Sequence, residues 1–314
     1  MQQQVLLVGA GPMAIEYAKV LDALGREPIV VGRGEASAQN LQNASGIHVA
    51  LGGIERWLTD NQGIPDTAII AVNEKELGAA TKSVIQSGVR SILVEKPGGL
   101  DAADIRAVGI AAAKHRAGVF VAYNRRFYAS VAAARQIIDE DGGVTSFNFE
   151  FTEWSHVIKD LVKATGVKEQ WFLQNSTHVI DLAFYLGGKP EKLSCYTTSG
   201  LDWHPASSVF AGAGISDRGA LFSYQANWDA PGRWGLEVLT KKHRLIFRPL
   251  EKLQLQKLGS VAVEPIALDD ELDQKYKPGL YRQVAAFIGG QTSDLCRIEE
   301  QIKLLPIYDQ MANY

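Results

Sequence analysis

The sequence has few cysteines, and they lie far apart. Cys195 and Cys296 are the two cysteines among 314 residues, so the chain has neither a disulfide framework nor the ligand spacing of a metal site. We therefore predict that the protein binds no metal. A reducing compartment is the default for such a chain, and we expect the protein in the cytoplasm.

Long apolar runs are also missing. The longest, such as residues 5–11 and 110–113, fall far short of the ~18 residues that a membrane span requires. Residues 1–4 include no basic side chain, so the apolar run that follows them does not resemble the core of a signal peptide. We expect no membrane association.

Neither sign of charge dominates the sequence. The 35 acidic residues nearly balance the 32 basic ones, which gives a formal net charge of −3. This balance argues against general electrostatic binding to nucleic acid or to an anionic membrane surface. Because 46% of the residues are hydrophobic and 21% are charged, the chain can bury a core, which excludes disorder.

The first 123 residues contain alternating strand and helix patterns. Short apolar runs are typical of buried parallel strands, and a helical pattern follows most of them. Repeated βα units predict a parallel sheet with helices on both faces, so the fold class is α/β with an N-terminal Rossmann domain. The predicted strands are residues 5–8, 29–31, 68–72, 92–94 and 119–123.

The pattern changes after residue 123. Residues 145–151 alternate between phenylalanine and polar side chains, which predicts a half-buried strand of an antiparallel sheet. We therefore predict two domains, residues 1–123 and residues 124–314. Further strands are predicted at 193–197, 220–228, 236–240, 245–247 and 253–256, and helices at 280–288 and 299–311.

A glycine motif follows the first predicted strand. In Gly9-x-Gly11-x-x-Ala14, the first glycine permits a tight turn and the second lets the backbone approach a pyrophosphate. The small third residue allows close packing of helix on strand, and Pro12 and Met13 begin a helix whose N-terminus attracts an anion. The alternative is a glycine turn in an α/β protein that binds no nucleotide.

The end of the second strand suggests which dinucleotide is bound. An NAD enzyme usually carries a carboxylate there for the ribose 2′-hydroxyl, whereas this chain has Arg33 between two glycines. A guanidinium can hold a 2′-phosphate, and Ser37 is close enough in sequence to assist, so we favour NADP over NAD. In the alternative, Arg33 is a solvated loop residue, Ser37 caps the next helix and Glu35 takes the acidic role.

A charged pair follows the strand at residues 92–94. Glu95 and Lys96, with Pro97 after them, lie at the carboxyl end of a parallel strand, the edge at which open α/β sheets bind ligands. A lysine there can donate or accept a proton, and Glu95 can contact the cofactor. The pattern alone also fits a surface ion pair.

In this context Glu95-Lys96-Pro97 resembles the signature of the Gfo/Idh/MocA family of sugar and polyol oxidoreductases. Residues 123–127 (Tyr-Asn-Arg-Arg-Phe) are similar to the family's passage into its second domain. His178-x-x-Asp181 resembles its histidine region, and residues 277–279 (Lys-Pro-Gly) agree as well. Each motif is short, but the ordered set spans essentially the whole chain.

The resemblance implies a fold, a reaction and two catalytic residues. Residues 1–123 would form a Rossmann domain that binds the dinucleotide. Residues 124–314 would form an α/β domain for substrate binding and oligomerisation, built on a large, mostly antiparallel open sheet. A nicotinamide would exchange hydride with a sugar carbon, while Lys96 and His178 move the hydroxyl proton. The sequence departs from the family where many members carry Asp four residues before the histidine. Gln174 occupies that position, and an amide cannot take a proton at neutral pH. The Lys96–Pro97 peptide bond is expected to be cis.

Other residues are expected at the two binding sites. Asn73 follows the predicted strand at residues 68–72, where the family usually has proline and histidine. It could still reach the cofactor. Asn124 is expected to contact the nicotinamide carboxamide or a substrate hydroxyl, unless it is a turn residue. Trp171 is the best candidate for stacking on a sugar because it lies just before Asn175 and His178, although sheet packing explains most tryptophans equally well.

The remaining candidates have structural alternatives. Asp181 is either a substrate ligand with Arg125 and Asn175, or a structural residue that holds His178 or Arg125. Without the family resemblance, His178 on its apolar helix would be interpreted as a core histidine. His204 and Arg233 lie in loops, where sequence does not decide between site and surface.

Three functions fit these observations. The first is an NADP-dependent oxidoreductase acting on a sugar, sugar nucleotide or polyol. The second is a glycosidase that oxidises and re-reduces its bound cofactor, and the third is a non-catalytic dinucleotide-binding sensor. The family resemblance also favours a homo-oligomer, a dimer or tetramer, formed by face-to-face pairing of the second-domain sheets.

Overall fold

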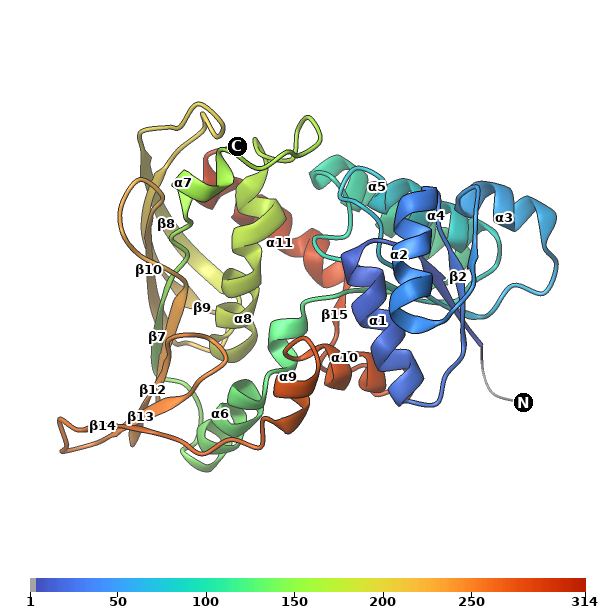
Figure 1. Ribbon diagram of the computed structural model, residues 1–314. Coiled ribbons are helices and arrows are strands. Elements are labelled where there is room, and N and C mark those ends of the chain that lie inside the picture. Colours follow the sequence, from blue (N-terminus) through green and yellow to red (C-terminus); the bar gives the residue numbers. More distant parts are fainter. Residues whose placement is uncertain (1–3) are drawn as a thin grey trace. The chain divides into compact units, whose positions relative to one another are not determined.

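The computed structural model describes residues 4–314, which form two compact units (Figure 1). The first unit contains the described residues up to Tyr123 together with Lys275–Leu304. The second contains Asn124–Gln274 and Leu305–Tyr314. The expectation about a signal peptide concerns residues 1–3 in large part, and these lie outside the described residues.

Lys275–Leu304 was expected in the second domain but belongs to the first unit. Its strand β15 (Cys296–Arg297) pairs antiparallel with β6 (Gly118–Val121), at one edge of the first sheet. Its helix α10 (Leu280–Ile288) contacts α1 (Pro12–Ala23). A late segment joins an early sheet because such pairings depend on tertiary contacts that local sequence does not encode.

The first unit is a seven-stranded sheet in the order β15-β6-β5-β4-β1-β2-β3. All pairings except that of β15 are parallel. This is the strand order of a Rossmann fold, so the predicted fold class is confirmed for this unit. The strands not yet given are β1 (Val5–Val8), β2 (Pro28–Val31), β3 (Val49–Ala50), β4 (Thr67–Ile70) and β5 (Ser91–Val94).

Helices surround these strands (Figure 1), which explains why the strands read as continuous apolar runs. All four residues of β1 and all four of β4 are buried. Asp101 caps α5 by accepting a hydrogen bond from the backbone N–H of Asp104 at 2.8 Å. Besides α1 and α10, the helices are α2 (Glu35–Ser45), α3 (Ile54–Asp60), α4 (Leu77–Gln86) and α5 (Ala102–His115).

The central strands of the first sheet end in register. Val8 of β1 lies opposite Val31 of β2 and Ile70 of β4, and Ile70 lies opposite Val94 of β5. The residues that follow these four strands therefore emerge at one edge of the sheet. This is the edge at which open α/β sheets bind their ligands.

The second unit is built on an eight-stranded sheet in the order β14-β13-β12-β11-β7-β10-β9-β8. Only β7 and β10 pair in parallel, so the sheet is mostly antiparallel, as predicted. Its strands are β7 (Ser146–Glu150), β8 (Pro190–Thr198), β9 (Val209–Ser216), β10 (Leu221–Asn227), β11 (Gly235–Leu239), β12 (His243–Phe247), β13 (Gln254–Lys257) and β14 (Val263–Pro265).

The labelled helices of this unit lie on one side of the sheet (Figure 1). Phe147 and Phe149 of β7 are buried on that side, where α8 contacts β7 and β11. Asn148 of β7 and Gln225 of β10 lie on the open face. The helices are α6 (Ala129–Glu140), α7 (Ser155–Ile158), α8 (Thr177–Gly187), α9 (Glu271–Lys275, which ends at the first unit) and α11 (Ile298–Ala312, which begins in the first unit), with short turns η1 (Asn124–Phe127) and η2 (Phe172–Ser176).

Four strands, β3, β9, β14 and β15, were not foreseen from the sequence. Strand β9 is rich in glycine and alanine, which have low strand propensity, and β3 and β14 are only two and three residues long. The strands that were predicted differ from the structure by up to three residues at either end. Within residues 4–314, no helix combines the length and the apolar character needed to cross a membrane.

Candidate active site

The glycine turn after β1 fits the phosphate-binding role predicted for it. Gly9 has φ +122°, and a Cβ atom there would lie 2.2 Å from the carbonyl oxygen of Ala71, so only glycine fits. A Cβ on Gly11 would meet open space. Gly11 is the N-cap of α1 and has no capping side chain, and Pro12 takes the first helical turn. Backbone N–H groups therefore face a space that an anion can enter.

Arg33 stands at the neighbouring strand end in a small pocket of about 90 Å³, which Gly9 and Asn73 also line. Its Nη1 lies 3.2 Å from Oε2 of Glu76, and its Nη2 lies 3.6 Å from Oε2 of Glu55. The Arg33 side chain remains 63% exposed. Its guanidinium is thus available to a phosphate but is already faced by two carboxylates.

The sequence analysis missed Glu55 and Glu76. It considered only Glu35 as the acidic residue, because Glu35 is the carboxylate nearest in sequence. Asn73 holds the turn that carries Glu76, since its Oδ1 accepts a hydrogen bond from the Glu76 backbone N–H at 3.2 Å. The Oγ of Ser37 donates to the Gly34 carbonyl at 3.0 Å, which is the local helix-start role left open above.

Glu95 and Lys96 follow β5 at the same sheet edge. The Tyr17 hydroxyl donates a 2.8 Å hydrogen bond to Glu95 Oε1, and burial raises the pKa of Glu95. Tyr17, Lys96 and Lys277 oppose that increase in the Glu95 pKa. The pKa of Tyr17 is raised well above its ordinary value by its own burial and by Glu95. Glu95 is therefore a partly buried carboxyl that interacts with a phenol and two cations.

The Lys96–Pro97 bond is cis, as predicted. The carbonyl of Pro97 accepts a 3.1 Å hydrogen bond from Nε2 of Gln301, and the same Nε2 is 3.0 Å from the hydroxyl of Tyr123. The late Lys-Pro-Gly motif also returns to this unit, because Nζ of Lys277 lies 3.0 Å from the sulfur of Met13. Segments from both ends of the chain thus surround the strand end that carries Lys96.

In the second unit, Asp181 forms a buried ion pair. Its two carboxylate oxygens accept hydrogen bonds from Nε and Nη2 of Arg126 at 2.8 and 2.5 Å, and both side chains are almost fully buried. The sequence analysis named Arg125 as the guanidinium that Asp181 would hold, and it did not consider Arg126. The two-pronged geometry fixes η1 against α8.

His178 lies in the first turn of α8. A π-helical turn, η2, precedes it and carries Gln174 and Asn175. Such turns are rare and often occur at functional sites. The His178 ring centre is 5.9 Å from that of Trp234, and the guanidinium of Arg125 lies 4.9 Å over the same tryptophan ring. Trp234, which the sequence analysis did not single out, therefore contacts two predicted site residues.

Glu153 is a buried carboxyl that sequence reasoning did not single out. It accepts hydrogen bonds from Nδ2 of Asn175 at 3.0 and 3.1 Å and from the hydroxyl of Ser176 at 2.8 Å. Nη1 of Arg233 is 3.5 Å away. Burial raises the pKa of Glu153 from 4.5 to about 7, against the opposing effects of Ser176, Arg233 and Asn175. The signal in the sequence was a lone acid after an apolar strand, which is too common to be specific.

Other predicted residues make contacts within the second unit. Asn124 accepts a 3.2 Å hydrogen bond from Nη1 of Arg125 within η1, and burial lowers the pKa of Arg125. Trp171 is 7% exposed and contacts Trp203 edge to face, so most of its ring is used in packing. His204 is buried between the Ser207 carbonyl and the Tyr314 hydroxyl, and burial lowers its pKa.

Comparison with known proteins identifies the class. Residues 3–123 match the GFO_IDH_MocA family, described as an oxidoreductase family with an NAD-binding Rossmann fold. This match agrees, over this part of the chain, with the resemblance inferred from the motifs. The family's description also agrees with the prediction of an NAD-binding oxidoreductase. No curated protein matches the chain in sequence.

Solved structures share the fold over nearly the full length. An NAD-binding oxidoreductase from Klebsiella pneumoniae superposes with a TM-score of 0.78 at 16% identity, covering 99% of this chain and 96% of its own. Levoglucosan dehydrogenase in complex with NADH and L-sorbose gives 0.77 at 18% identity, covering 100% and 96%. A UDP-N-acetylglucosamine 3-dehydrogenase from Acidithiobacillus ferrooxidans gives 0.74 at 14% identity, covering 98% and 96%.

Proposed function

We propose that the protein is a nicotinamide-dependent oxidoreductase that transfers hydride to or from a CH–OH carbon of a carbohydrate. The observation that carries the proposal is the register of the first sheet. Because β1 and β5 end together, the glycine turn at Gly9 and the lysine at Lys96 share one sheet edge. The similarity to two sugar-related dehydrogenases supports a carbohydrate substrate.

The proposed reaction consists of a hydride transfer and a proton transfer. When bound, the nicotinamide supplies the acceptor or donor of the hydride at the substrate carbon. In the oxidation direction, the hydroxyl proton passes to uncharged Lys96 Nζ, and in reduction Lys96 returns it to the forming alkoxide. His178 is proposed as the second group that bonds this hydroxyl. Gln174 has no proton to exchange, so the pair works without a carboxylate beside the histidine.

The remaining site residues are proposed to bind rather than react. Gly11 and the first turn of α1, with Met13, hold the pyrophosphate, while Asn73, Glu95 and Asn124 contact the rest of the cofactor. Arg125, Trp171, Asn175 and Asp181 are proposed for the substrate side. Because Asp181 forms a buried ion pair with Arg126, we propose that it acts indirectly, by positioning the first turns of α8.

For the cofactor we propose a preference for NADP over NAD. Arg33 is exposed at the end of β2, where the adenosine ribose of a Rossmann dinucleotide lies. A 2′-phosphate can replace Glu55 and Glu76 as its anionic partner. Ser37 is close enough along the chain to assist once its hydrogen bond to Gly34 opens.

The proposal is tested by a substrate screen with each cofactor. Sugars, sugar nucleotides and polyols are incubated with NADP or NAD, and nicotinamide absorbance is followed. We expect a stoichiometric absorbance change with at least one carbohydrate. Release of an aglycone without net absorbance change would instead identify a redox-recycling glycosidase, and cofactor binding without any turnover would identify a sensor.

We also propose a homo-oligomer in the cytoplasm. The open face of the second sheet presents polar residues such as Asn148 and Gln225 beside the exposed Leu221 and Tyr196. Face-to-face pairing of such sheets across a two-fold axis could bury ~1,600 Å² in total. Light scattering at micromolar concentration should give a dimer or tetramer, and a mass near 34.2 kDa would contradict the pairing. Neither Cys195 nor Cys296 forms a disulfide in the described residues, as suits a reducing compartment.

A further inference from the structure

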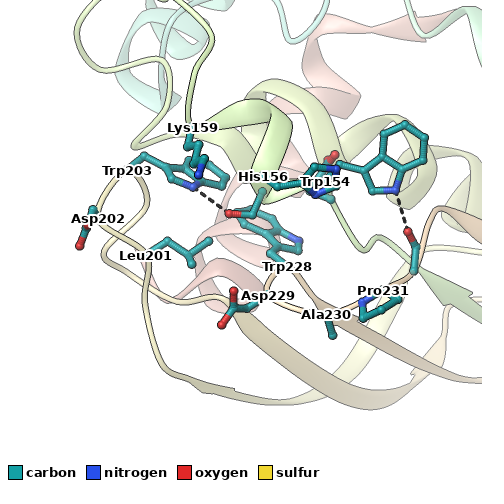
Figure 2. Close-up of a pocket in the computed structure, with 13 residues that line it drawn as sticks. Trp154, His156, Lys159, Leu201, Asp202, Trp203, Trp228, Asp229, Ala230 and Pro231 are labelled. Atoms are coloured by element: carbon teal, nitrogen blue, oxygen red, sulfur yellow. Dashed lines mark hydrogen bonds between the residues drawn. The ribbon is translucent and has the colours of Figure 1, made fainter.

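A large pocket opens in the second unit beside Glu153. It measures about 1000 Å³ and is lined by aromatic, acidic and basic side chains. Figure 2 shows Trp203 and Trp228 close together, with Trp154 beyond them and Asp229, Ala230 and Pro231 along another side. Its volume lies at the upper end of the range typical of small-molecule sites.

Sheet topology explains why these residues meet. Strands β7 and β10 run in parallel, and Glu150 near the end of one lies opposite Gln225 near the end of the other. Strand β9 begins opposite the end of β10, since Val209 faces Asn227. The segments at residues 153–159, 201–203 and 228–232 therefore leave or enter the sheet at one edge, and these segments line the pocket.

The tryptophans are held in fixed orientations. Nε1 of Trp154 donates to the Gly232 carbonyl at 2.9 Å, and Nε1 of Trp203 donates to the Ser155 hydroxyl at 3.0 Å. Trp203 stacks on buried Trp228 with 2° between the ring planes. Since the protein satisfies these indole N–H groups, the ring surfaces are what the pocket offers to a ligand.

Trp154 is the most exposed of the three. Its side chain is 48% exposed, and the guanidinium of Arg233 lies 4.8 Å over its ring. The same Arg233 reaches Glu153, which binds Asn175. Glu153, which lines the pocket, is therefore in direct contact with Asn175, one of the residues that we propose for the substrate.

The charges in the pocket select against phosphate. Glu153 is already partnered by Arg233, and the exposed residues of the lining include Asp202 and Asp229 against one lysine, Lys159. Two exposed carboxylates would repel a diphosphate but accept hydrogen bonds from neutral hydroxyls. The apolar C–H face of a pyranose ring fits an exposed indole surface.

We propose that this pocket binds an uncharged sugar ring next to the one that reacts, so that the substrate is a disaccharide or other glycoside rather than a free monosaccharide or a sugar nucleotide. The inference rests on the proposed function, because it takes the reacting group to be a carbohydrate. The bound ring stacks on Trp154, and its hydroxyls donate to Asp229.

The test measures binding without cofactor or turnover. Isothermal titration compares maltose, cellobiose and lactose with glucose and galactose, using the full-length chain. At least one disaccharide should bind about tenfold more tightly than its own monosaccharides. Trp154→Ala should remove most of this advantage. Trp154→Phe, which keeps an aromatic face, should retain most of it, and Trp57→Ala in the first unit serves as the control for loss of a tryptophan.

Two results would overturn the inference: no disaccharide binds more tightly than its monosaccharides, or Trp154→Ala keeps the full advantage while remaining folded by circular dichroism. These outcomes are separate from failure of the proposed function. A disaccharide that binds without any change in nicotinamide absorbance supports the pocket and removes the oxidoreductase proposal. If a monosaccharide is oxidised and no disaccharide binds more tightly than its monosaccharides, the oxidoreductase proposal is supported and the pocket inference is contradicted.

Discussion

The two units prepare their candidate sites by different physical means. In the first unit the main elements are backbone: a glycine that admits no Cβ at Gly9, and the bare N-terminus of α1. In the second unit they are side chains from distant segments, such as Glu153 with Asn175 and Arg126 with Asp181. A backbone site follows from a contiguous motif, whereas a side-chain site exists only after long-range packing.

The two units also differ in how far their ion pairs are exposed to solvent. The Arg33 pairs of the first unit are solvent-exposed, so water screens them and they contribute little to stability. The Arg126–Asp181 pair of the second unit is almost fully buried, so each ion depends on the other for its solvation. We therefore expect substitutions in the first unit to act mainly on cofactor and chemistry, and substitutions in the second to act on folding as well.

The largest expected effect is on the chemistry of the first unit. Lys96→Ala should lower turnover by ~10²–10⁴-fold, because general acid–base assistance is lost. Cofactor affinity, measured by fluorescence titration, should change far less. The exposed Lys75→Ala is the control and should keep its turnover. Near-normal turnover of Lys96→Ala on its true substrate would remove Lys96 from the proposed reaction.

The buried ion pair should give the next largest effect. Asp181→Ala should destabilise the protein by ~3–5 kcal/mol, because the Arg126 guanidinium loses its carboxylate in a buried position. Thermal unfolding followed by circular dichroism measures the loss. The matched control, Glu76→Ala, breaks an exposed pair with Arg33 and should cost less than ~1 kcal/mol. Equal losses for the two variants would abolish the contrast between the units.

Glu153 should make the stability of the second unit depend on pH. Its folded-state pKa of about 7 exceeds the ordinary value of 4.5, so between these values the folded protein binds more protons than the unfolded chain. The free energy of unfolding should therefore fall as pH rises from about 4.5 to about 7, by up to about 3 kcal/mol at ~1.4 kcal/mol per pKa unit. Above that window the contribution is constant.

The check on Glu153 is urea unfolding at a series of pH values. Glu153→Gln keeps hydrogen-bonding capacity but cannot ionise, so its stability should vary less over this window than that of the unmodified protein. Glu150→Gln, on the neighbouring strand end, is the control and should keep the original dependence. A Glu153→Gln profile that parallels the original would assign the dependence to other groups.

The smallest expected effect concerns the cofactor. NADP should bind more tightly than NAD, and Arg33→Asp should reverse or erase the difference. One guanidinium–phosphate contact is worth ~1.5–3 kcal/mol, or roughly ten- to a hundredfold in affinity. Titration of both cofactors decides the matter. Since Glu76 competes for the guanidinium, Glu76→Gln should increase NADP affinity, and NAD binding equal to or tighter than NADP binding would refute the preference.

Local sequence determined most of the first unit up to Tyr123 and the candidate residues that it carries. Strand runs, the glycine motif and the Glu95-Lys96-Pro97 signature each lie within a few residues, and the order of βα units fixes which strand ends share an edge. The alternation in residues 145–151 likewise placed Phe147 and Phe149 on the covered face of the second sheet. Such features could be predicted because their physical causes act over short stretches of chain.

Tertiary structure alone decided the partners of the charged groups. Nothing local links Arg33 to Glu76, Asp181 to Arg126, or Trp234 to both His178 and Arg125, since the members of each set come from different elements. The same holds for the pocket beside Trp154, which exists because a parallel pair of strands ends where an antiparallel strand begins. Side chains far apart in sequence are brought together by the packing of the whole unit, so no short sequence pattern predicts which of them become partners.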